Sequence, residues 1–526
     1  MIWNIAKKEL LSNLMTLRFC IGTVLFLVMS VLFTCVLLSD YRVKLESYSG
    51  YVSRNNDELK KLMTYQNLKP TIYKPPEILS IFSKGFEENT GNSIQISIDE
   101  APEIASAAVP KYPRVILIGL NTPMDFPETA STTVSKNPLL AVFPVLDVTL
   151  VFKLVISVLA LLLAYDSISG EKEDGTLKLM LASGIPRHQV LLGKLVGGMI
   201  TLAIPIAVGF LMISLILEFS PTVEMTGNDW MRIALMFLFS LIMVSLLFNL
   251  GLLISSVTRH ASDTIMFLLL IWVLFVLVIP NGSAYLAEKI KTIEPREKIA
   301  RQVQEIWWGF QGKIMDFWHS GNVPPDDTIQ SDASEPWGGY YRFASKNLIQ
   351  YKQKLDAFAE PLRIKYANDA WRASKAYLES LKRQKDLADL ISKFSPISLY
   401  EELITSLSRT DVPGSERFAN QAREYRQQII DYMYNKKAFS SLRYFTTAKE
   451  EYMSDITAND YDLARKKYDS VEPRPLDVSD VPQFHYRPEG VADTMNRILP
   501  DVLILCFISI LLFMCAFISF MRCDVK

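Results

Sequence analysis

The sequence predicts an α-helical polytopic membrane protein, with six transmembrane helices and a mostly helical extracytoplasmic domain that has a small α+β part. Half of the 526 residues are apolar, and the mean hydropathy of +0.18 is too high for a chain of several soluble domains. The apolar residues gather in six runs, which two long polar inserts separate. Lys plus Arg (55) and Asp plus Glu (56) nearly cancel, so we expect no nucleic-acid partner.

The six apolar runs approach or reach the length of about 20 residues that a bilayer span needs. They occupy residues 19–38, 148–164, 195–217, 233–254, 264–280 and 502–521. We therefore divide the chain into an interfacial elbow helix (1–18), a first span (19–38), a first extracytoplasmic insert (39–146), spans two to five with a cytoplasmic loop at 166–194 (147–280), a second insert (281–496), and a sixth span with a short tail (497–526).

The first 18 residues predict a helix that lies in the membrane interface. Apolar side chains recur there at steps of three and four, at Trp3, Ala6, Leu10, Leu14 and Leu17. A plain cytoplasmic extension of the first span is the alternative. The apolar run that follows is about 20 residues long and lacks a small-residue cleavage site, so we expect no cleaved signal peptide.

The charges of the short loops predict the orientation, because Lys and Arg concentrate on the cytoplasmic side of a membrane protein. Basic residues flank the spans at Lys7, Lys8, Arg18, Lys172, Lys178, Arg187, Lys194, Arg259, Arg522 and Lys526. The short loop 219–230 on the other side carries acidic residues without Lys or Arg. We therefore expect both termini in the cytoplasm and both large inserts outside.

The cytoplasmic segment 161–198 reads LLLAYDSISGEKEDGTLKLMLASGIPRHQVLLGKLVGG. Asp166 ends the second span in this prediction, and Gly170 permits a turn. Gly175 and Thr176 then open a short amphipathic helix that Pro186 and its neighbours end. Leu177, Met180 and Leu181 form its apolar face, and Gly193, Gly197 and Gly198 allow close helix contacts beyond it. Such a helix suits contact with a cytoplasmic motor, and an ordinary interfacial loop is the alternative.

The string from Asp166 to Lys194 resembles the signature of type-2 permeases, the transmembrane subunits of ATP-binding-cassette (ABC) exporters. Those proteins carry a G-E-(R/K)-E-x-G-T-L-x-x-L-L core, then a Pro-Arg pair and a Gly-Lys at the next span. The elbow helix, the six spans, the stretch 252–263 and a fifth span ending in Pro280 are similar too. The two large inserts look most like the subgroup of multicopper-enzyme maturation permeases, related to those for nitrous-oxide reductase. The resemblance covers well under half of the chain.

The resemblance implies a dimer of permeases in a bacterial cytoplasmic (inner) membrane, on two ATPase subunits that contact a coupling helix in loop 166–194. By position, the coupling residues would be Asp166, Gly170, Glu171, Glu173, Gly175, Thr176, Leu177, Met180, Pro186 and Arg187. The carboxylates would pair with basic groups of the ATPase, and Leu177 and Met180 would fill a groove on it. For Asp166, capping of local backbone is an equal alternative.

The chain itself is not predicted to be an enzyme. The stretch 170–176, GEKEDGT, has the glycine spacing of a phosphate-binding loop but lacks its lysine, and its three acidic groups would repel phosphate. We therefore expect ATP and Mg²⁺ only on a separate ATPase. The five cysteines and four histidines show no metal-ligand spacing, so we expect no metal and no bound cofactor.

The second insert predicts long helices. Apolar residues recur helically within 299–314 and 348–362, which favours two helices packed as a hairpin, with Pro361 kinking or ending one of them. Further helices are expected from Ser395–Pro396 and near Ser415, and an extended run after about Ser470. The aromatic residues at 307–318 and 337–343 form either a helical core or a binding surface. In the first insert, 93–98 and 114–118 are strand-like.

Three charges near the outer ends of spans are candidates for an outer gate, because charges inside spans are costly. They are Asp147, Lys153 and Asp501. The alternative is that all three reach to the membrane interface.

The sequence thus predicts the permease of an ABC exporter for an unspecified substrate. Mechanotransmission to a periplasmic partner without transport is the first alternative, and a non-transporting scaffold or receptor is the second. Expected partners are the ATPase, a second permease copy (identical or a paralogue), the lipid bilayer and, in the first alternative, a periplasmic protein.

Overall fold

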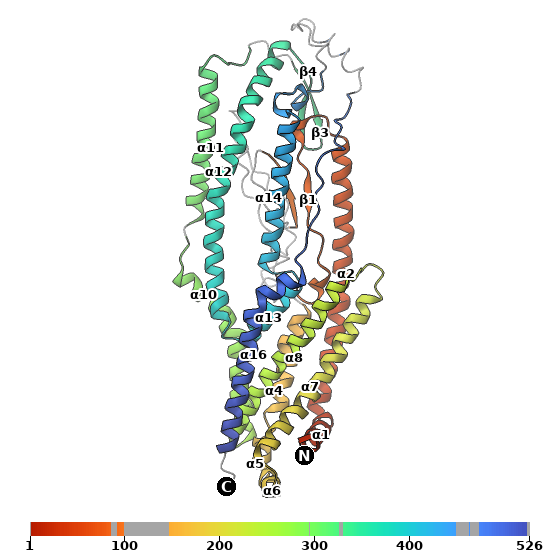
Figure 1. The fold of residues 1–526 in the computed structure, drawn as a ribbon, viewed down its shortest axis with the longest axis vertical. Coiled ribbons are helices and arrows are strands. Elements are labelled where there is room, and N and C mark those ends of the chain that lie inside the picture. Colours follow the sequence, from red (N-terminus) through yellow and green to blue (C-terminus); the bar gives the residue numbers. More distant parts are fainter. Residues whose placement is uncertain are drawn as a thin grey trace.

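A computed structural model describes residues 2–85, 92–98, 147–182, 184–293, 295–325, 330–448 and 473–522, with two isolated positions at 462 and 466. The molecule is elongated (Figure 1), with a bundle of helices at one end and a lobe of long helices at the other. Six helices in the described part are long and apolar enough to cross a membrane. They confirm the predicted polytopic α-helical fold. We call the end of the bundle that carries both termini its base.

Four of the six spans begin within six residues of the predicted positions, whereas the third and the sixth begin 8 and 11 residues earlier. The six spans are α2 (Leu17–Lys60); α3 (Val148–Val151), η3 (Phe152–Ile156), α4 (Ser157–Ala164) and α5 (Ser169–Glu173) together; α7 (Arg187–Glu218); α8 (Gly227–Val257); α9 (Ala261–Val273), η4 (Leu274–Val278) and α10 (Ile279–Ile290) together; and α16 (Val491–Arg522). The elbow helix, α1 (Ile2–Leu14), packs across the foot of α7. Gly193 and Gly197 permit this approach, because a Cβ on either would lie within 3 Å of α1 atoms.

Two spans run further than predicted. Helix α2 continues past residue 38 to Lys60, and its 44 residues correspond to about 66 Å. Residues 39–60 contain no proline and a single glycine, so nothing in them ends the helix. The fifth span also passes Pro280, which follows the π-helical turn η4. A π turn widens the helix locally, and this accommodates a residue that cannot donate a backbone hydrogen bond.

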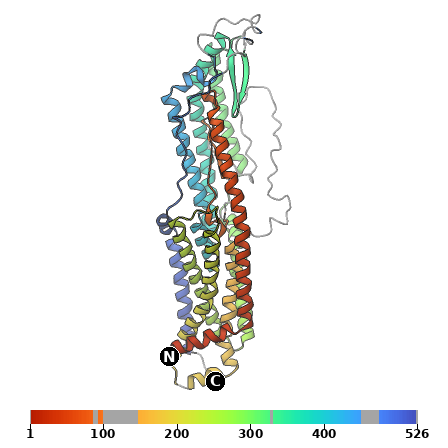
Figure 2. The ribbon, with the colours of Figure 1, turned by 90° about the vertical axis from the view of Figure 1, so that its right-hand side faces the viewer.

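The lobe consists of long helices and two small sheets (Figures 1 and 2). Its helices are α11 (Arg296–His319), α12 (Lys346–Ser392) and α14 (Val412–Asn435), with short 3₁₀ turns at Tyr65–Asn67, Ala438–Ser440 and Leu442–Tyr444. A further 3₁₀ turn, Ile78–Ile81, packs against the bundle core. The predicted hairpin is confirmed, since α11 and α12 pack along each other, where Phe317 stacks on Phe358. Pro361 does not end α12, which continues for about 30 residues beyond it.

The sheets were predicted only in part. Strand β1 (Thr71–Tyr73) pairs antiparallel with β2 (Ser93–Gln95), which confirms the first half of the expected strand 93–98. The expected strand 114–118 lies outside the described residues. The second sheet, β3 (Gln330–Glu335) with β4 (Gly338–Ala344), was not anticipated. Of the aromatic residues, Phe310 and Phe343 are buried whereas Trp308 is exposed, so the set belongs mainly to the lobe core.

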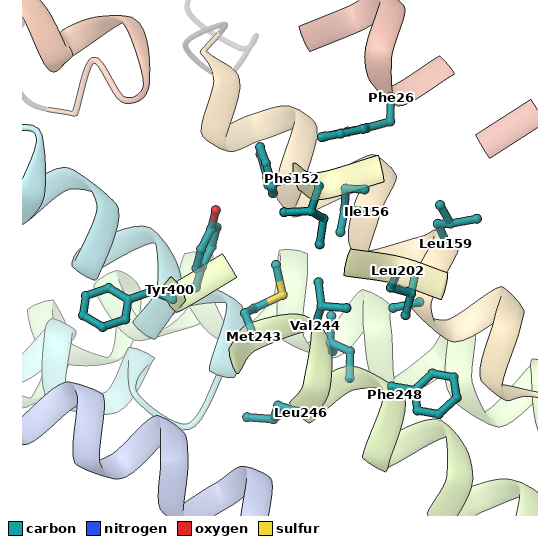
Figure 3. Packing of buried hydrophobic residues seen from close by; sticks show 14 of the residues in the cluster. Phe26, Phe152, Ile156, Leu159, Leu202, Met243, Val244, Leu246, Phe248 and Tyr400 are labelled. Atoms are coloured by element: carbon teal, nitrogen blue, oxygen red, sulfur yellow. The ribbon is translucent and has the colours of Figure 1, made fainter. Parts of the chain in front are cut away.

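Helix α13 (Pro396–Leu407) belongs to the second insert by sequence, but it packs among the spans. As predicted, Ser395 caps its N-terminus and accepts a hydrogen bond from the backbone of Ser398. The Tyr400 ring lies beside Phe152 and Met243 (Figure 3), and its hydroxyl is 2.9 Å from that of Ser240 in α8. Its apolar face therefore belongs to the core of the bundle, and the lobe has a second core of its own.

Helix α14 and the proline-rich stretch before the sixth span both lie close to their predicted positions. Helix α14 begins at Val412, three residues before Ser415, because Asp411 caps it and Pro413 occupies its first turn. Residues 473–490 then run without helix or strand to the start of α16, as the proline-rich sequence predicts.

Candidate functional site

The predicted coupling segment, from Asp166 to Arg187, lies at the base of the bundle, below α4 (Figure 1), and contains α5 and the short helix α6 (Thr176–Ala182). Gly175 and Gly184 flank α6 with φ of 72° and 78°, a conformation that favours glycine. Gly170 lies in α5, where a Cβ would be 3.2 Å from the Asp166 Cβ. Thr176 begins α6 and is exposed, and Pro186 precedes the first turn of α7. The predicted helix is thus present with its predicted ends.

Glu171 binds within the chain. Its carboxylate lies 2.9 Å from the Lys194 ammonium and 3.3 Å from that of Lys8. Lys194 is only 1% exposed and also contacts Glu9 of α1 at 2.9 Å. One lysine of α7 therefore joins the elbow helix to the coupling segment, and Glu171 does not face outward as we expected.

Lys172 and Glu173 bind the ends of two spans. The Lys172 ammonium donates to the Thr258 carbonyl at 3.0 Å and to carbonyls of the last turn of α8. Glu173 accepts a hydrogen bond from the Ala261 amide at the start of α9 (3.2 Å). A cation near carbonyls at a C-terminus and a carboxylate near amides at an N-terminus are both favourable. The positive charge of Lys172 thus lies at the C-terminal end of α8, and the negative charge of Glu173 lies at the N-terminal end of α9.

Two arginines connect the segment to the remaining spans. Arg18 of α2 forms an ion pair with Asp166 and lies over the Tyr165 ring, 5.0 Å from its centre. Asp166 therefore pairs with a side chain 148 residues away and does not cap local backbone. Arg187 donates to the carbonyl of Met521 in the last turn of α16 (2.8 Å). Together with the contacts above, the segment is bonded to α2, α7, α8, α9 and α16.

The apolar face of α6 points inward, which corrects the predicted groove-filling role of Leu177. Leu177 is completely buried in the bundle core, and Met180 is half-buried. Leu179, which is 73% exposed, is the apolar side chain that α6 presents to the outside. A cleft of about 430 Å³ separates α6 from α1 and is lined by Asn4, Ile5, Lys8, Glu171, Thr176, Met180 and Ile185. A partner would therefore meet Leu179 beside an open cleft.

The predicted gate residues do not meet in one site. Asp147 caps α3, where it accepts from the Leu150 amide at 2.8 Å and from the Lys84 amide at 3.3 Å. Burial, with a smaller contribution from the charge of Glu401, raises the pKa of Asp147 to about 6. Its place at a helix end gives it a structural role.

The other two gate candidates pair with residues around α13. The Lys153 ammonium lies 2.7 Å from the Glu401 carboxylate, and Asp501 of α16 forms an ion pair with Lys393, just before α13. Lys153 thus ties the second span to α13, and Asp501 ties the sixth span to the end of α12.

Sequence reasoning missed a cluster of eight charges at the junction of bundle and lobe, which we call the outer charge cluster. Its members are Glu77, Asp229, Arg232, Arg409, Asp411, Arg417, Glu489 and Arg497. Arg409 contacts Glu77 at 3.0 Å and Asp229 at 2.7 Å, so it bridges the first insert to α8. The four carboxylates balance the four guanidinium groups.

Arg232, at the start of α8, is fully buried in this cluster. It donates to the carbonyls of Leu407 and Glu489 at 2.8 Å and to the Thr494 hydroxyl at 3.0 Å. These partners lie at the end of α13 and the start of α16. The only sequence signal was the pair of charges at the start of the fourth span, and nothing local indicated partners so far along the chain.

Comparison with known proteins identifies the family of this chain. The model of the ABC-2 family transporter proteins matches residues 3–525. The probable ABC transporter permease protein NosY of Stutzerimonas stutzeri is 54% identical over 52 residues, which is 10% of this chain and 19% of that protein. Its namesake in Pseudomonas aeruginosa is 49% identical over 67 residues, 12% of this chain and 24% of that protein. The chain thus aligns with less than a quarter of either relative, whereas the family match spans nearly its whole length, and it belongs to the ABC-2 family of transporter proteins.

Proposed function

We propose that this chain is the permease subunit through which a separate ATPase drives export across the bacterial inner membrane. In this proposal both termini and the coupling segment face the cytoplasm, the lobe lies outside, and two copies, or this chain and a paralogue, form the transport unit. ATP and Mg²⁺ bind to the ATPase alone. The chain supplies the path and the mechanical connections, and it catalyses no reaction.

The observation that carries the proposal is the bonding of the coupling segment. Its charged side chains contact α2, α7, α8, α9 and α16, while Leu179 and the cleft beside α1 remain open to a partner. A displacement of α6 would therefore reach most of the bundle. The bias of basic residues toward this end supports its cytoplasmic location.

The proposal is tested by copurification. The tagged full chain is isolated from its native membrane, and associated ATPases are identified by mass spectrometry and by ATP hydrolysis. We expect Leu179→Glu to remove the ATPase, because a charge replaces the exposed apolar contact. Trp308→Glu, at a position on α11 that is 62% exposed, is the matched control and should retain it. Retention of the ATPase by Leu179→Glu would count against α6 as the docking element.

A second candidate function, force transmission to a protein outside the membrane, has its own supporting observation. Helix α2 is attached at both ends: Arg18 binds Asp166 of the coupling segment, and the chain just beyond its far end binds the second sheet of the lobe. There the Glu335 carboxylate accepts hydrogen bonds from the Met63 amide and the Thr64 hydroxyl, both at 2.6 Å, and from the Asn67 side chain. One continuous helix thus joins the base to the lobe.

Hydrogen exchange separates the two functions. If α2 transmits force, trapping the ATPase with vanadate should change the exchange of residues 330–344 in the full complex. Arg18→Gln should reduce that change while the ATPase stays bound. An unchanged exchange pattern in the trapped wild-type complex would leave export as the better account.

A further inference from the structure

The end of α12 lies at the depth of the fifth span and not above it. Helices α10 and α12 run antiparallel in contact, with the Lys291 ammonium donating to the Arg383 carbonyl and Gln384 donating to the Lys291 carbonyl (2.8 Å). Ser395 then donates to the Phe275 carbonyl at 2.7 Å, inside the π turn η4, where a widened helix has a carbonyl to spare.

The hydrogen bond from Ser395 to Phe275 gives the depth of Ser395 in the membrane, because the rise per helical residue is known. Phe275 is 14 residues from Ala261, which begins the span next to the polar residues Arg259 and His260, so it lies at most about 21 Å along the span. The hydrocarbon layer is about 30 Å thick, and helix tilt only reduces the height of Phe275. Ser395 is therefore at the level of acyl chains, and the residues just before it lie near the edge of this layer.

Large apolar side chains face outward at this level. Leu390 on the last turn of α12 is 62% exposed, and Phe394, two residues after the end of this otherwise polar helix, is 77% exposed. Tyr285, Leu286 and Ile290 on the neighbouring α10 are exposed as well, and they lie 10 to 15 residues beyond Phe275, farther toward the lobe. We call these five residues the collar. The collar continues the exposed apolar face of the fifth span, which includes Leu270 and Leu277.

Basic side chains border the collar on the lobe side. The stretches 288–291 and 382–389 hold five basic and three acidic residues. Two of the five are ion-paired, Lys382 with Glu416 of α14 and Lys385 with Asp389. Lys289 lies over the Tyr285 ring, 5.5 Å from its centre. Tyrosine with lysine directly above it is typical of the headgroup region of a bilayer.

We propose that the collar inserts into the bilayer leaflet on the side of the lobe, with Phe394 and Leu390 among the acyl chains and the basic border at the phosphates. Lipid then holds the end of the lobe that lies next to the membrane, in addition to the attachment through the outer charge cluster. Its hairpin α11–α12 cannot tilt without moving Phe394 through the headgroup layer. This inference is independent of any ATPase and of the proposed export.

Site-directed spin labelling tests the inference on the full chain. In a variant without native cysteines, single nitroxide labels are placed at positions 394 and 390 and the protein is reconstituted in phosphatidylethanolamine and phosphatidylglycerol vesicles. Labels at 270, exposed on α9, and at 308, exposed on α11, are the lipid and water references. Collision with molecular oxygen and with a neutral nickel chelate is measured at all four positions.

We expect labels at 394 and 390 to collide mainly with oxygen, as at 270, with a loss of nickel collisions relative to 308. Nickel access like that of 308 at either position would overturn the proposal, because the collar would lie in water. Protection from both reagents would also overturn it, because protein, such as a second copy of this chain, would then cover the collar. Thermal unfolding of each labelled protein shows that the label has not disturbed the fold.

Discussion

The base of the bundle and the outer charge cluster both join helices through charge, but they differ in exposure. At the base, Glu173 is half-exposed and Lys8 largely exposed, and α6 carries the exposed Leu179. In the outer charge cluster, eight charges compensate one another and most are buried. A surface-exposed segment can be moved by a partner, whereas a buried network resists separation. In the function that we propose, the base would receive a displacement from the ATPase, and the buried cluster would keep the outer helix ends together.

The largest expected effect comes from breaking the outer charge cluster at its centre. Arg232→Met removes three buried hydrogen bonds and leaves an uncompensated negative charge among Glu77, Asp229 and Glu489, so we expect a loss of about 3–5 kcal/mol. Thermal unfolding in detergent measures it. Arg487→Met, which removes an exposed pair with Glu424, is the matched control and should change little. Equal unfolding temperatures for the two variants would contradict a rigid outer junction.

A smaller effect is expected at the base. Lys194→Met leaves Glu9 and Glu171 without their shared buried cation, and we expect a loss of about 2–3 kcal/mol. Lys8→Met removes only the exposed partner of Glu171 and is the control. If the base receives the displacement, Lys194→Met should also lower ATPase-coupled activity more than its stability loss explains. If Lys194→Met were as active and as stable as Lys8→Met, Lys194 would not connect the elbow helix to the coupling segment in a way that matters for function.

The smallest expected effect is a pH dependence at Asp147. Its pKa is raised to about 6 by burial, so between the ordinary value near 4 and pH 6 the folded chain binds more protons than the unfolded chain. This group therefore makes the chain less stable as pH rises through that window, by about 2 °C in unfolding temperature. Asp147→Asn should remove that slope. A slope unchanged by the substitution would assign the pH dependence to other groups.

The sequence predicted those features whose signals are local. Gly175 and Gly184 bound α6, Ser395 and Pro396 begin α13, and the glycines at 193 and 197 allow a close helix contact, all as expected, although the partner helix α1 was not predicted. The sequence did not show which distant residues the charged side chains contact. The backbone carbonyls that bind Lys172 and the amide that binds Glu173 belong to the ends of other spans, and any residue type could stand there.

The position of α13 was missed for a related reason. Its apolar face has the same period in a lobe core as in a bundle core, so periodicity alone does not say which core it joins. The deciding contacts, Tyr400 with Ser240 and Ser395 with Phe275, connect residues more than 100 positions apart. The same holds for Arg409, which joins the first insert to α8.

The attachments at the two ends of α2 have a consequence for how this chain can change in length. Each added residue lengthens a helix by about 1.5 Å and rotates everything beyond it by about 100°. One insertion between Arg18 and Lys60 would turn Met63 and Thr64 away from Glu335, whereas seven residues, close to two full turns, would nearly restore the phase and raise the lobe by about 10 Å. Natural relatives with this helix should therefore differ in its length by whole turns.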